Sequence, residues 1–278
     1  MEGREKVNGT AYFSRLGLDN SDIAANEATL RLLQKRHLLT VPFENLDIHW
    51  KRPIVLEVDR FYEKIVIDKR GGFCYELNGL FNGLLRSLGF QTRLISACVG
   101  DGNGNFSPEY DHAAIIVTIG EKEYLADVGF GAFTAEPLQF VADIEQHDAT
   151  GVYVIRHHDD AYFGAAKKDG YDWKTEYIFK PIARDLMEFG PRCDFQQYSP
   201  ESHFLKGKIC SLLTETGRKT LTDKSYIVTM DGERSETTIG SETEFDLILG
   251  QEFGISKNDR ANLKENGQNV LRYIKCNT

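Results

Sequence analysis

The first third of the chain carries apolar residues at helical spacing. A helix is predicted from a cap at Asp22 to a stop before Pro42. Its apolar face consists of Ile23, Leu30, Leu33 and Leu38. A second helix is predicted around residues 59–67, with Phe61 and Ile65 on one side. The N-terminal region is therefore expected to be helical.

The most regular apolar face in the sequence follows Cys74. It consists of Leu77, Leu80, Phe81, Leu84, Leu85 and Leu88. This spacing predicts an amphipathic helix, and Gly89 supplies a stop just past its end. Since Gly71 and Gly72 tolerate positive φ and a sharp turn, the sequence places Cys74 in the first turn of this helix.

After residue 90 the pattern changes to alternation or to short apolar runs, which predicts strands. The predicted strands are 93–99, 113–119, 123–128, 152–157, 161–166 and 174–179. Short polar turns between them favour an antiparallel sheet or a small barrel. Nearer the C-terminus, a strand pair at 225–230 and 236–239 precedes helices predicted at 242–250 and 258–274.

The order of helices, then strands, then mixed elements predicts an α+β multidomain fold and does not fit a doubly wound sheet. The changes in hydrophobic pattern place approximate domain boundaries near residues 90 and 200. The three regions are therefore 1–90, 91–200 and 201–278.

Composition narrows the choice of partners. The 278 residues include 33 basic and 42 acidic side chains, a net charge of −9 without a basic stripe. Nucleic acid and anionic membranes are therefore poor candidates. The N-terminus shows no signal-peptide pattern, and no stretch approaches the roughly 18 apolar residues that span a bilayer, so a cytoplasmic protein is expected.

The sequence shows no pattern typical of a metal site. Five cysteines, an odd number without a CxxC motif, favour free thiols over a disulfide framework or a zinc site. Residues 157–160, HHDD, are interpreted as a polar turn because neighbours on a strand point apart. Residues 101–105 are similar to a calcium loop, but Phe106 stands where such a loop needs glycine.

The predicted position of Cys74 at a helix start makes it a candidate nucleophile. Unpaired N–H groups and the helix dipole favour an anion there, which predicts a pKa for Cys74 below the usual ~8.5 and a reactive thiolate. The alternative is a small buried apolar residue that simply begins the helix face. A neighbouring base would favour the chemical interpretation.

His112 and Asp127 are candidates for that base and its partner. His112 begins the apolar run HAAIIVTIG, and Asp127 stands among apolar neighbours in the next run. If residues 120–121 form a two-residue hairpin loop, the two side chains point to the same face, whereas a three-residue loop would separate them. Taken alone, each is more often a core residue or a turn cap. Together with Cys74 they supply a nucleophile, a base and an orienting carboxylate.

Five segments of the chain are similar to those of the arylamine N-acetyltransferase family, in its bacterial form. They are VPFENLDI at 41–48, RGGFCYELN at 70–78, DHAAIIV at 111–117, LADVGFG at 125–131 and SPESHF at 199–204. The match runs through most of the chain, and the RGGxC block together with PFENL, the DH before an apolar strand and DVGFG is highly specific.

This resemblance implies a three-domain fold with a Cys-His-Asp arrangement like that of cysteine proteases. The domains would be a helical bundle at 1–90 carrying the nucleophile, a β-barrel at 91–200 carrying histidine and aspartate, and an α/β lid at 201–278. By their positions in the matching motifs, Cys74, His112 and Asp127 would be the catalytic triad. The residues implied to line the acceptor pocket are Phe43, Val99, Phe130 and Phe204.

The implied reaction is ping-pong transfer of acetyl from acetyl-CoA, through acetyl-Cys74, to arylamines, arylhydrazines or N-hydroxyarylamines, without a metal. CoA is a polyanion and the chain is acidic, so local donors must bind it. The candidate donors are Lys167, Lys168, Lys206 and Lys208. The alternative for each is a solvated surface lysine.

Some features leave alternatives open. Ala132 stands where the family often has a second glycine, and small residues follow His112 where bulkier ones are common; both departures are expected to affect the shape of the acceptor pocket. The same triad would also serve a hydrolase or transglutaminase-like enzyme, an amide synthase that closes a ring, or a ligand-binding protein with slow turnover. Arg70 is expected either to anchor the loop before Cys74 through a buried ion pair or to lie in solvent.

Overall fold

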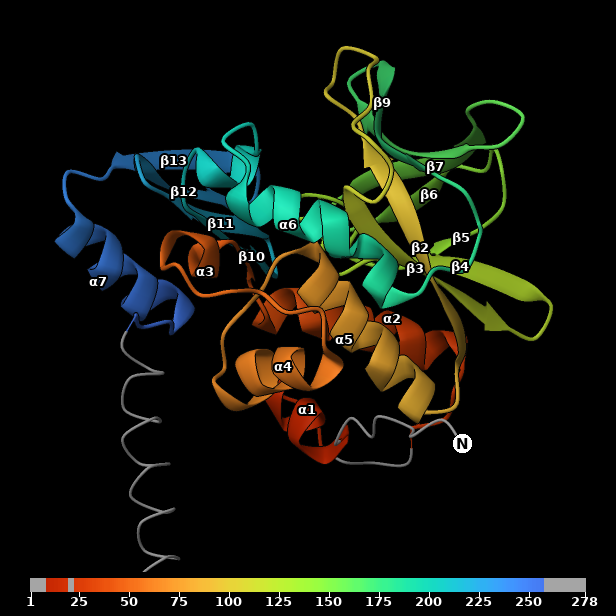
Figure 1. The fold of residues 1–278 in the computed structure, drawn as a ribbon. Coiled ribbons are helices and arrows are strands. Elements are labelled where there is room, and N and C mark those ends of the chain that lie inside the picture. The colour runs from red at the N-terminus through yellow and green to blue at the C-terminus, as the bar shows by residue number, and fades with distance from the viewer. Residues whose placement is uncertain (1–8, 20–22, 258–278) are drawn as a thin grey trace, which may run out of the picture.

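The computed structural model describes residues 9–19 and 23–257 (Figure 1). Its N-terminal helices are α1 (Gly9–Arg15), α2 (Glu27–Thr40), α3 (Leu46–His49), α4 (Val58–Tyr62) and α5 (Cys74–Ser87). A π-helical turn, Glu63–Ile67, continues α4, so the helix predicted at 59–67 is confirmed, with wider hydrogen bonding in its second half.

Helix α2 begins later than predicted. Asn26 is its N-cap, and the side-chain oxygen of Asn26 accepts the Thr29 N–H at 2.9 Å. The cap predicted at Asp22 is therefore wrong for this helix, and Asp22 itself lies outside the described residues. Asn and Asp cap helices about equally well, so residue type alone did not separate the two positions.

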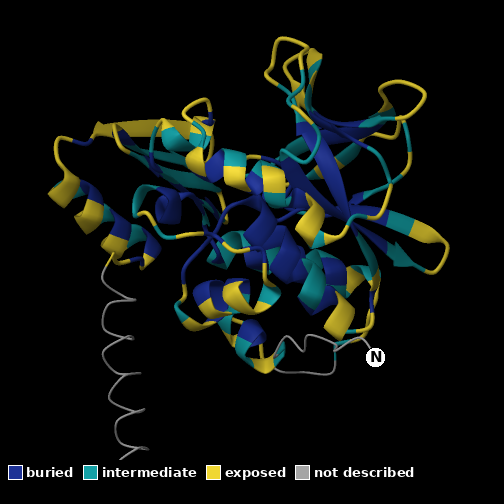
Figure 2. Cartoon of the chain, in the orientation of Figure 1, coloured by how far each residue is buried: buried dark blue, intermediate teal, exposed yellow. Residues whose placement is uncertain are grey.

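Helix α5 runs through the centre of the molecule (Figure 2). Its fully buried aliphatic and aromatic side chains include Leu77, Leu80, Phe81, Leu84 and Leu85. The predicted stop is confirmed, since Leu88 is the C-cap and Gly89 has a φ of 91° that favours glycine.

Eight antiparallel strands form one curved sheet in the order β5-β4-β3-β2-β9-β8-β7-β6. They are β2 (Gln91–Val99), β3 (His112–Ile119), β4 (Lys122–Ala126), β5 (Leu138–Gln139), β6 (Gln146–Asp148), β7 (Gly151–His157), β8 (Phe163–Asp169) and β9 (Asp172–Phe179). The Gln146 side chain bonds to the Gln139 main chain at 2.7 and 2.9 Å, which links the end strands and nearly closes a barrel (Figure 1). The six strands predicted between residues 93 and 179 are present. Strands β5 and β6 were not predicted, because they are too short to show a hydrophobic period.

A second antiparallel sheet has the order β1-β10-β11-β12-β13. Its strands are β1 (Phe43–Glu44), β10 (Ile209–Thr214), β11 (Gly217–Thr222), β12 (Ser225–Met230) and β13 (Glu233–Thr238). The predicted strand pair and the helix predicted at 242–250, α7 (Glu242–Phe253), are confirmed. The helix predicted at 258–274 lies outside the described residues. Strand β1 comes from the N-terminal region, which is thus not purely helical.

A connecting segment runs between the two sheets and across α5 (Figure 1). It contains the short helices η2 (Leu186–Phe189) and η3 (His203–Leu205), with α6 (Gly190–Tyr198) between them. Most residues of α6 are polar, so the hydrophobic pattern did not predict it.

Candidate active site

Cys74 is the first residue of α5, and the loop before it is pressed against β1. A Cβ on Gly71 would lie 2.0 Å from the Pro42 carbonyl oxygen, and the Glu44 N–H donates to the Gly72 carbonyl at 2.8 Å. Neither glycine has a positive φ. The two glycines are therefore needed for close backbone approach and not for the left-handed turn that the sequence suggested.

The Cys74 thiol is buried. The residue is 3% exposed, and its Sγ donates to the Asp111 carbonyl at 3.9 Å. Burial raises the pKa of Cys74 well above its ordinary value, the charge of Asp111 adds to this, and the Ala113 N–H opposes it. Desolvation thus outweighs the lowering of the Cys74 pKa that was predicted from the helix start. A thiolate at this buried position needs a positive charge beside it.

His112 and Asp127 come from a hairpin whose loop has two residues, the length for which the sequence places both side chains on one face. Strands β3 and β4 pair up to Ile119 opposite Lys122, which leaves residues 120–121 as the loop. His112 is the first residue of β3, and Asp127 directly follows β4. His112 Nε2 lies 2.7 Å from Asp127 Oδ2, and both side chains are at most 3% exposed.

Three donors hold the Asp127 carboxylate. Its Oδ1 accepts from Asn78 Nδ2 at 2.9 Å and from the Gly129 N–H at 2.8 Å, while its Oδ2 faces His112. Burial alone would raise the pKa of Asp127, but His112 and these hydrogen bonds lower it below its ordinary value. Because the ionised carboxylate only accepts, it holds the proton of the neutral imidazole on Nε2 and leaves Nδ1 as the basic nitrogen.

Asn78 is a positioning residue that sequence analysis missed. It lies one turn after Cys74 on α5, and its Nδ2 also donates to the Ala113 carbonyl at 2.6 Å. A Cβ on Gly129 would lie 2.7 Å from Asn78 Nδ2 and 2.8 Å from Cys74 Cα, so the loop after Asp127 crosses directly over the helix start. The four-residue spacing of Cys74 and Asn78, which puts both on one helix face, is the signal that could have identified it.

Two aromatic rings lie against His112. The ring centroids of Phe130 and Tyr177 are each 5.1 Å from that of the imidazole. Burial, followed by the charge of Asp127 and a hydrogen bond to it, raises the pKa of the Tyr177 hydroxyl. Val99 lies opposite Tyr177 in the pairing of β2 with β9. Sequence analysis missed Tyr177, because its strand pattern is that of an ordinary core residue.

Phe43 and Phe204, the other two predicted pocket residues, lie beside Phe73, which directly precedes Cys74. The ring of Phe204 is 6.1 Å from that of Phe43 and 6.0 Å from that of Phe73. The predicted pocket residues thus form two groups, one near the histidine and one near the start of α5.

Three of the four candidate lysines are poorly placed to bind phosphate. Lys208 is 9% exposed, and its Nζ lies 2.5 Å from Glu242 and 3.2 Å from Asp223. Lys206 is exposed to solvent, and Lys168 already forms an ion pair with Glu145 at 3.6 Å.

The fourth, Lys167, lines a cavity of about 740 Å³ where strands of the barrel and of the second sheet meet. The charged side chains around it are Lys35, Lys167, Glu215, Arg218 and Asp231. Burial lowers the pKa of Lys167 and brings that of Arg218 to about 10. Arg218 donates to a serine hydroxyl and forms no ion pair with any described residue. Sequence analysis missed Arg218, since a single arginine on a polar strand gives no signal.

The remaining candidate stretches are turns. The Asp101 carboxylate accepts the Asn103 N–H at 2.7 Å, and the Asp159 carboxylate accepts the Ala161 N–H at 2.8 Å. In the part of the chain that the structure describes, no group of three or more His, Cys, Asp or Glu side chains is arranged to hold a metal ion. Nor does any helix within 9–19 and 23–257 have the length and apolar character to cross a membrane.

Known proteins resemble this chain over most of its length. A family model described as N-acetyltransferase matches residues 27–261. The arylamine N-acetyltransferase of Escherichia coli (strain K12) is 30% identical over 251 residues, with 89% of each chain covered. The solved structure of a Bacillus cereus arylamine N-acetyltransferase, described as having a unique Cys-His-Glu catalytic triad, has a TM-score of 0.82 at 28% identity, covering 92% of this chain and 100% of that one. The Mycobacterium marinum arylamine N-acetyltransferase in complex with CoA has a TM-score of 0.82 at 25% identity, with coverages of 92% and 94%.

Proposed function

The chain belongs to the arylamine N-acetyltransferase family, and we propose that it transfers acetyl groups from acetyl-CoA to arylamines through Cys74. In this proposal His112 is the base and Asp127 is the carboxylate that orients it. The observation that carries the proposal is the 2.7 Å contact between His112 Nε2 and Asp127 Oδ2, which leaves Nδ1 as the proton acceptor. The carbonyl of Asp111 and the N–H of Ala113, the residues on either side of His112, also contact the Cys74 thiol.

In the first half-reaction, His112 Nδ1 takes the Cys74 proton. The imidazolium charge compensates the thiolate, which burial otherwise disfavours. The sulfur then attacks the acetyl carbonyl carbon of acetyl-CoA. The bond from that carbon to the CoA sulfur breaks, CoA leaves as a thiol with the proton from His112, and acetyl-Cys74 remains.

In the second half-reaction, the acceptor nitrogen attacks the carbonyl carbon of acetyl-Cys74. His112 removes one proton from that nitrogen, the carbon–sulfur bond breaks, and the proton returns to Cys74. Arylamines and arylhydrazines suit this step because their weakly basic nitrogen is uncharged at neutral pH, and N-hydroxyarylamines offer an uncharged hydroxyl oxygen as the acceptor in the same step. Their flat rings also suit a pocket with apolar walls. We assign those walls to Phe43, Val99, Phe130 and Phe204, the residues of the two groups described above.

We assign the catalytic residues and the lid to three regions of the chain. Residues 1–90 carry the nucleophile, residues 91–200 carry His112 and Asp127, and residues 201–278 are assigned to the α/β lid. Support comes from the position of Phe204, whose ring meets the start of the catalytic helix.

We assign the cavity near Lys167 and Arg218 to the phosphates of CoA. Two partly buried cations face it, and burial strengthens their attraction for an anion. It is lined by Phe133, whose ring is 5.8 Å from that of Phe130, so it lies close to the aromatic residues around His112. A cavity of about 740 Å³ is large enough for a substantial part of CoA.

Acetyl-CoA alone is expected to add one acetyl group to the protein, on Cys74. Intact-mass and peptide mass spectrometry measure the addition and its position, and a subsequent arylamine should remove the group. A hydrolase or transglutaminase-like enzyme would leave the protein unmodified, and a sequestering protein would retain the acetyl group after the amine is added. Either result would overturn the proposed function.

Replacing Arg218 by alanine is expected to raise the KM for acetyl-CoA about tenfold and to leave kcat nearly unchanged. The reason is that a phosphate contact remote from the reacting carbon binds ground state and transition state alike. Steady-state kinetics at varied acetyl-CoA concentration measure both constants. The matched control is Arg234→Ala, since Arg234 is an exposed arginine on β13 of the same sheet. An unchanged KM in Arg218→Ala, or equal effects of the two variants, would contradict the assignment.

A further inference from the structure

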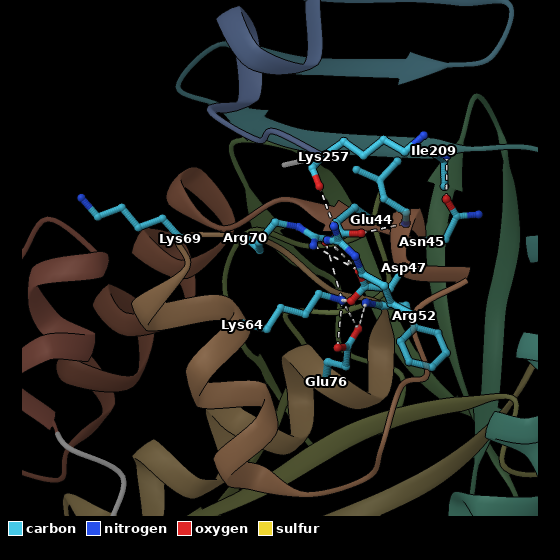
Figure 3. Close-up of polar contacts among 12 residues, drawn as sticks. Glu44, Asn45, Asp47, Arg52, Lys64, Lys69, Arg70, Glu76, Ile209 and Lys257 are labelled. Carbon is cyan, nitrogen blue, oxygen red and sulfur yellow. Dashed lines mark hydrogen bonds and ion pairs between the residues drawn. The ribbon is translucent and has the colours of Figure 1, made fainter. Parts of the chain in front are cut away.

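Five charged side chains are buried together behind the start of α5 (Figure 3). This buried charge cluster consists of Glu44, Asp47, Lys64, Arg70 and Glu76, and each residue is at most 3% exposed. Taking charged groups out of water costs several kcal/mol per ion, and apolar residues of similar volume often stabilise a fold equally well. The mechanism described above uses none of the five.

The cluster ties four chain segments to one another. The Arg70 guanidinium lies 2.6 Å from Glu44 Oε1 and 3.1 Å from Asp47 Oδ1, so Arg70 anchors its loop through a buried ion pair. Lys64 Nζ lies 2.9 Å from Asp47 Oδ2 and 2.9 Å from each oxygen of Glu76. Lys64 therefore joins the Arg70 half of the cluster to the first turn of α5.

Glu76 brings the cluster into contact with the backbone that carries Cys74. Its Oε2 accepts the N–H of Phe73, the residue directly before Cys74, at 3.1 Å. A Cβ on Gly72 would lie 2.9 Å from the same oxygen, so the loop is packed directly on this carboxylate. A change in the charge of Glu76 therefore alters the hydrogen bond that holds the main chain next to Cys74.

The charges of the cluster do not balance. Three carboxylates face two cations, and Arg52, 3.8 Å from Asp47, lies at the edge with 23% of its side chain exposed. Burial raises the pKa of Glu76 to about 7; Lys64 opposes this, and Asp47 and Glu44 add to it. The Cys193 thiol of α6 also faces Glu76. Because the folded protein holds the Glu76 proton more tightly than the unfolded chain does, stability falls as pH rises from about 4.5 through about 7. The charge on Glu76 is thus not explained by stability.

We propose that Glu76 is a positioning residue for Cys74: its negative charge, held by Lys64, fixes the Phe73–Cys74 backbone in the geometry needed for attack. This inference rests on the proposed function only in naming Cys74 as the nucleophile. Above neutral pH the charged carboxylate makes a strong hydrogen bond to the Phe73 N–H. Below neutral pH the protonated group makes a weaker one, and the first turn of α5 loosens.

The test is the variant Glu76→Gln, which keeps the side-chain shape and removes the charge. Its rate of Cys74 acetylation is expected to be about tenfold lower than that of the wild type at pH 8 and about twofold lower at pH 6, where wild-type Glu76 is mostly protonated. The KM for acetyl-CoA is expected to stay the same. If the amide oxygen still accepts the Phe73 N–H, the amide NH₂ faces Lys64 Nζ, so a melting curve at pH 8 is recorded to show that the variant is folded at the assay temperature.

The matched control is Glu63→Gln, since Glu63 directly precedes Lys64 and is exposed. It should behave as wild type at both pH values. Equal loss of rate in Glu76→Gln at pH 6 and pH 8, no loss at pH 8, or a variant that fails to fold would overturn the proposal.

Alkylation of Cys74 by iodoacetamide separates this inference from the proposed function. The alkylation rate, followed by mass spectrometry, reports the nucleophile without acetyl-CoA, and the same pH-dependent ratio of wild type to Glu76→Gln is expected. If alkylation shows this ratio while acetyl-CoA leaves the wild type unmodified, the proposed function fails and the positioning role stands. If acetylation occurs but the ratio is the same at both pH values, the positioning role fails and the function stands.

Discussion

Replacing Cys74 by alanine is expected to abolish acetyl transfer. Alanine offers no nucleophile, and a loss of at least about 10⁴-fold in turnover is typical when the nucleophile of a triad is removed. The small change in side-chain volume at the first position of α5 should leave the fold intact. Chromatographic detection of the acetylated arylamine measures turnover, and intact-mass spectrometry measures the acetyl-enzyme.

The matched control for this result is Cys98→Ala. Cys98 is also a buried, unpaired cysteine, but it lies in the middle of the pairing of β2 with β9. It should retain both acetylation and turnover. Persistent acetylation of Cys74→Ala at another residue, or turnover within tenfold of wild type, would show that Cys74 is not the acetyl carrier.

Replacing Asp127 by asparagine is expected to lower kcat about 10³- to 10⁴-fold. The amide oxygen would take the place of Oδ1, which accepts from Asn78 and Gly129, so the amide NH₂ would face His112 Nε2. His112 Nε2 must then accept, and the imidazole proton moves to Nδ1, the nitrogen that has to take the Cys74 proton. His112 is then present in the wrong tautomer to act as a base. A pH profile of kcat, together with the rate of Cys74 acetylation, measures the loss of activity.

The same substitution also affects stability. Since the pKa of Asp127 is lowered in the fold, its ionised form stabilises the protein above the unfolded pKa of about 4, and this contribution disappears as pH falls through the folded pKa. Thermal unfolding at pH 7 should therefore show a lower midpoint for Asp127→Asn while the protein stays folded at the assay temperature. The control Asp172→Asn, at an exposed position, should change neither property. A folded Asp127→Asn variant with near wild-type kcat would show that Asp127 does not orient the base.

Much of the fold could be read from hydrophobic periodicity. The helix after Cys74 is confirmed because its broad apolar face is unambiguous and a glycine with positive φ follows it. Strands β10 and β11 escaped prediction because β10, ICSLLT, is a short apolar run without strict alternation, and β11, GRKTLT, has a single large apolar residue. Strand β10 pairs with β1, a two-residue strand about 165 positions earlier in the chain, and β11 pairs with β10 and β12. No local pattern contains the contact between β10 and β1.

The relation of His112 to Asp127 was also predictable, since hairpin parity depends only on the number of loop residues. The direction of the Cys74 pKa was predicted wrongly. The sequence shows a helix start, which favours an anion, but the degree of burial that opposes it depends on segments far away in the chain. The contact of Tyr177 with His112 likewise required coordinates, because the two residues lie far apart in the chain.

The sequence by itself determined the order of the helical, strand-rich and mixed regions, the face shared by the histidine and the aspartate, and the family to which the motifs belong. These features depend on local spacing, because helical and strand periods and a two-residue loop act over a few residues. Only the tertiary structure decided how far each polar group is removed from water and which charges meet. It showed that the loop before Cys74 rests on a buried cluster with three carboxylates and two cations, drawn from segments up to 32 residues apart (44 to 76). Burial and pairing set the pKa of each group and hence its chemistry, and both are properties of the packed chain.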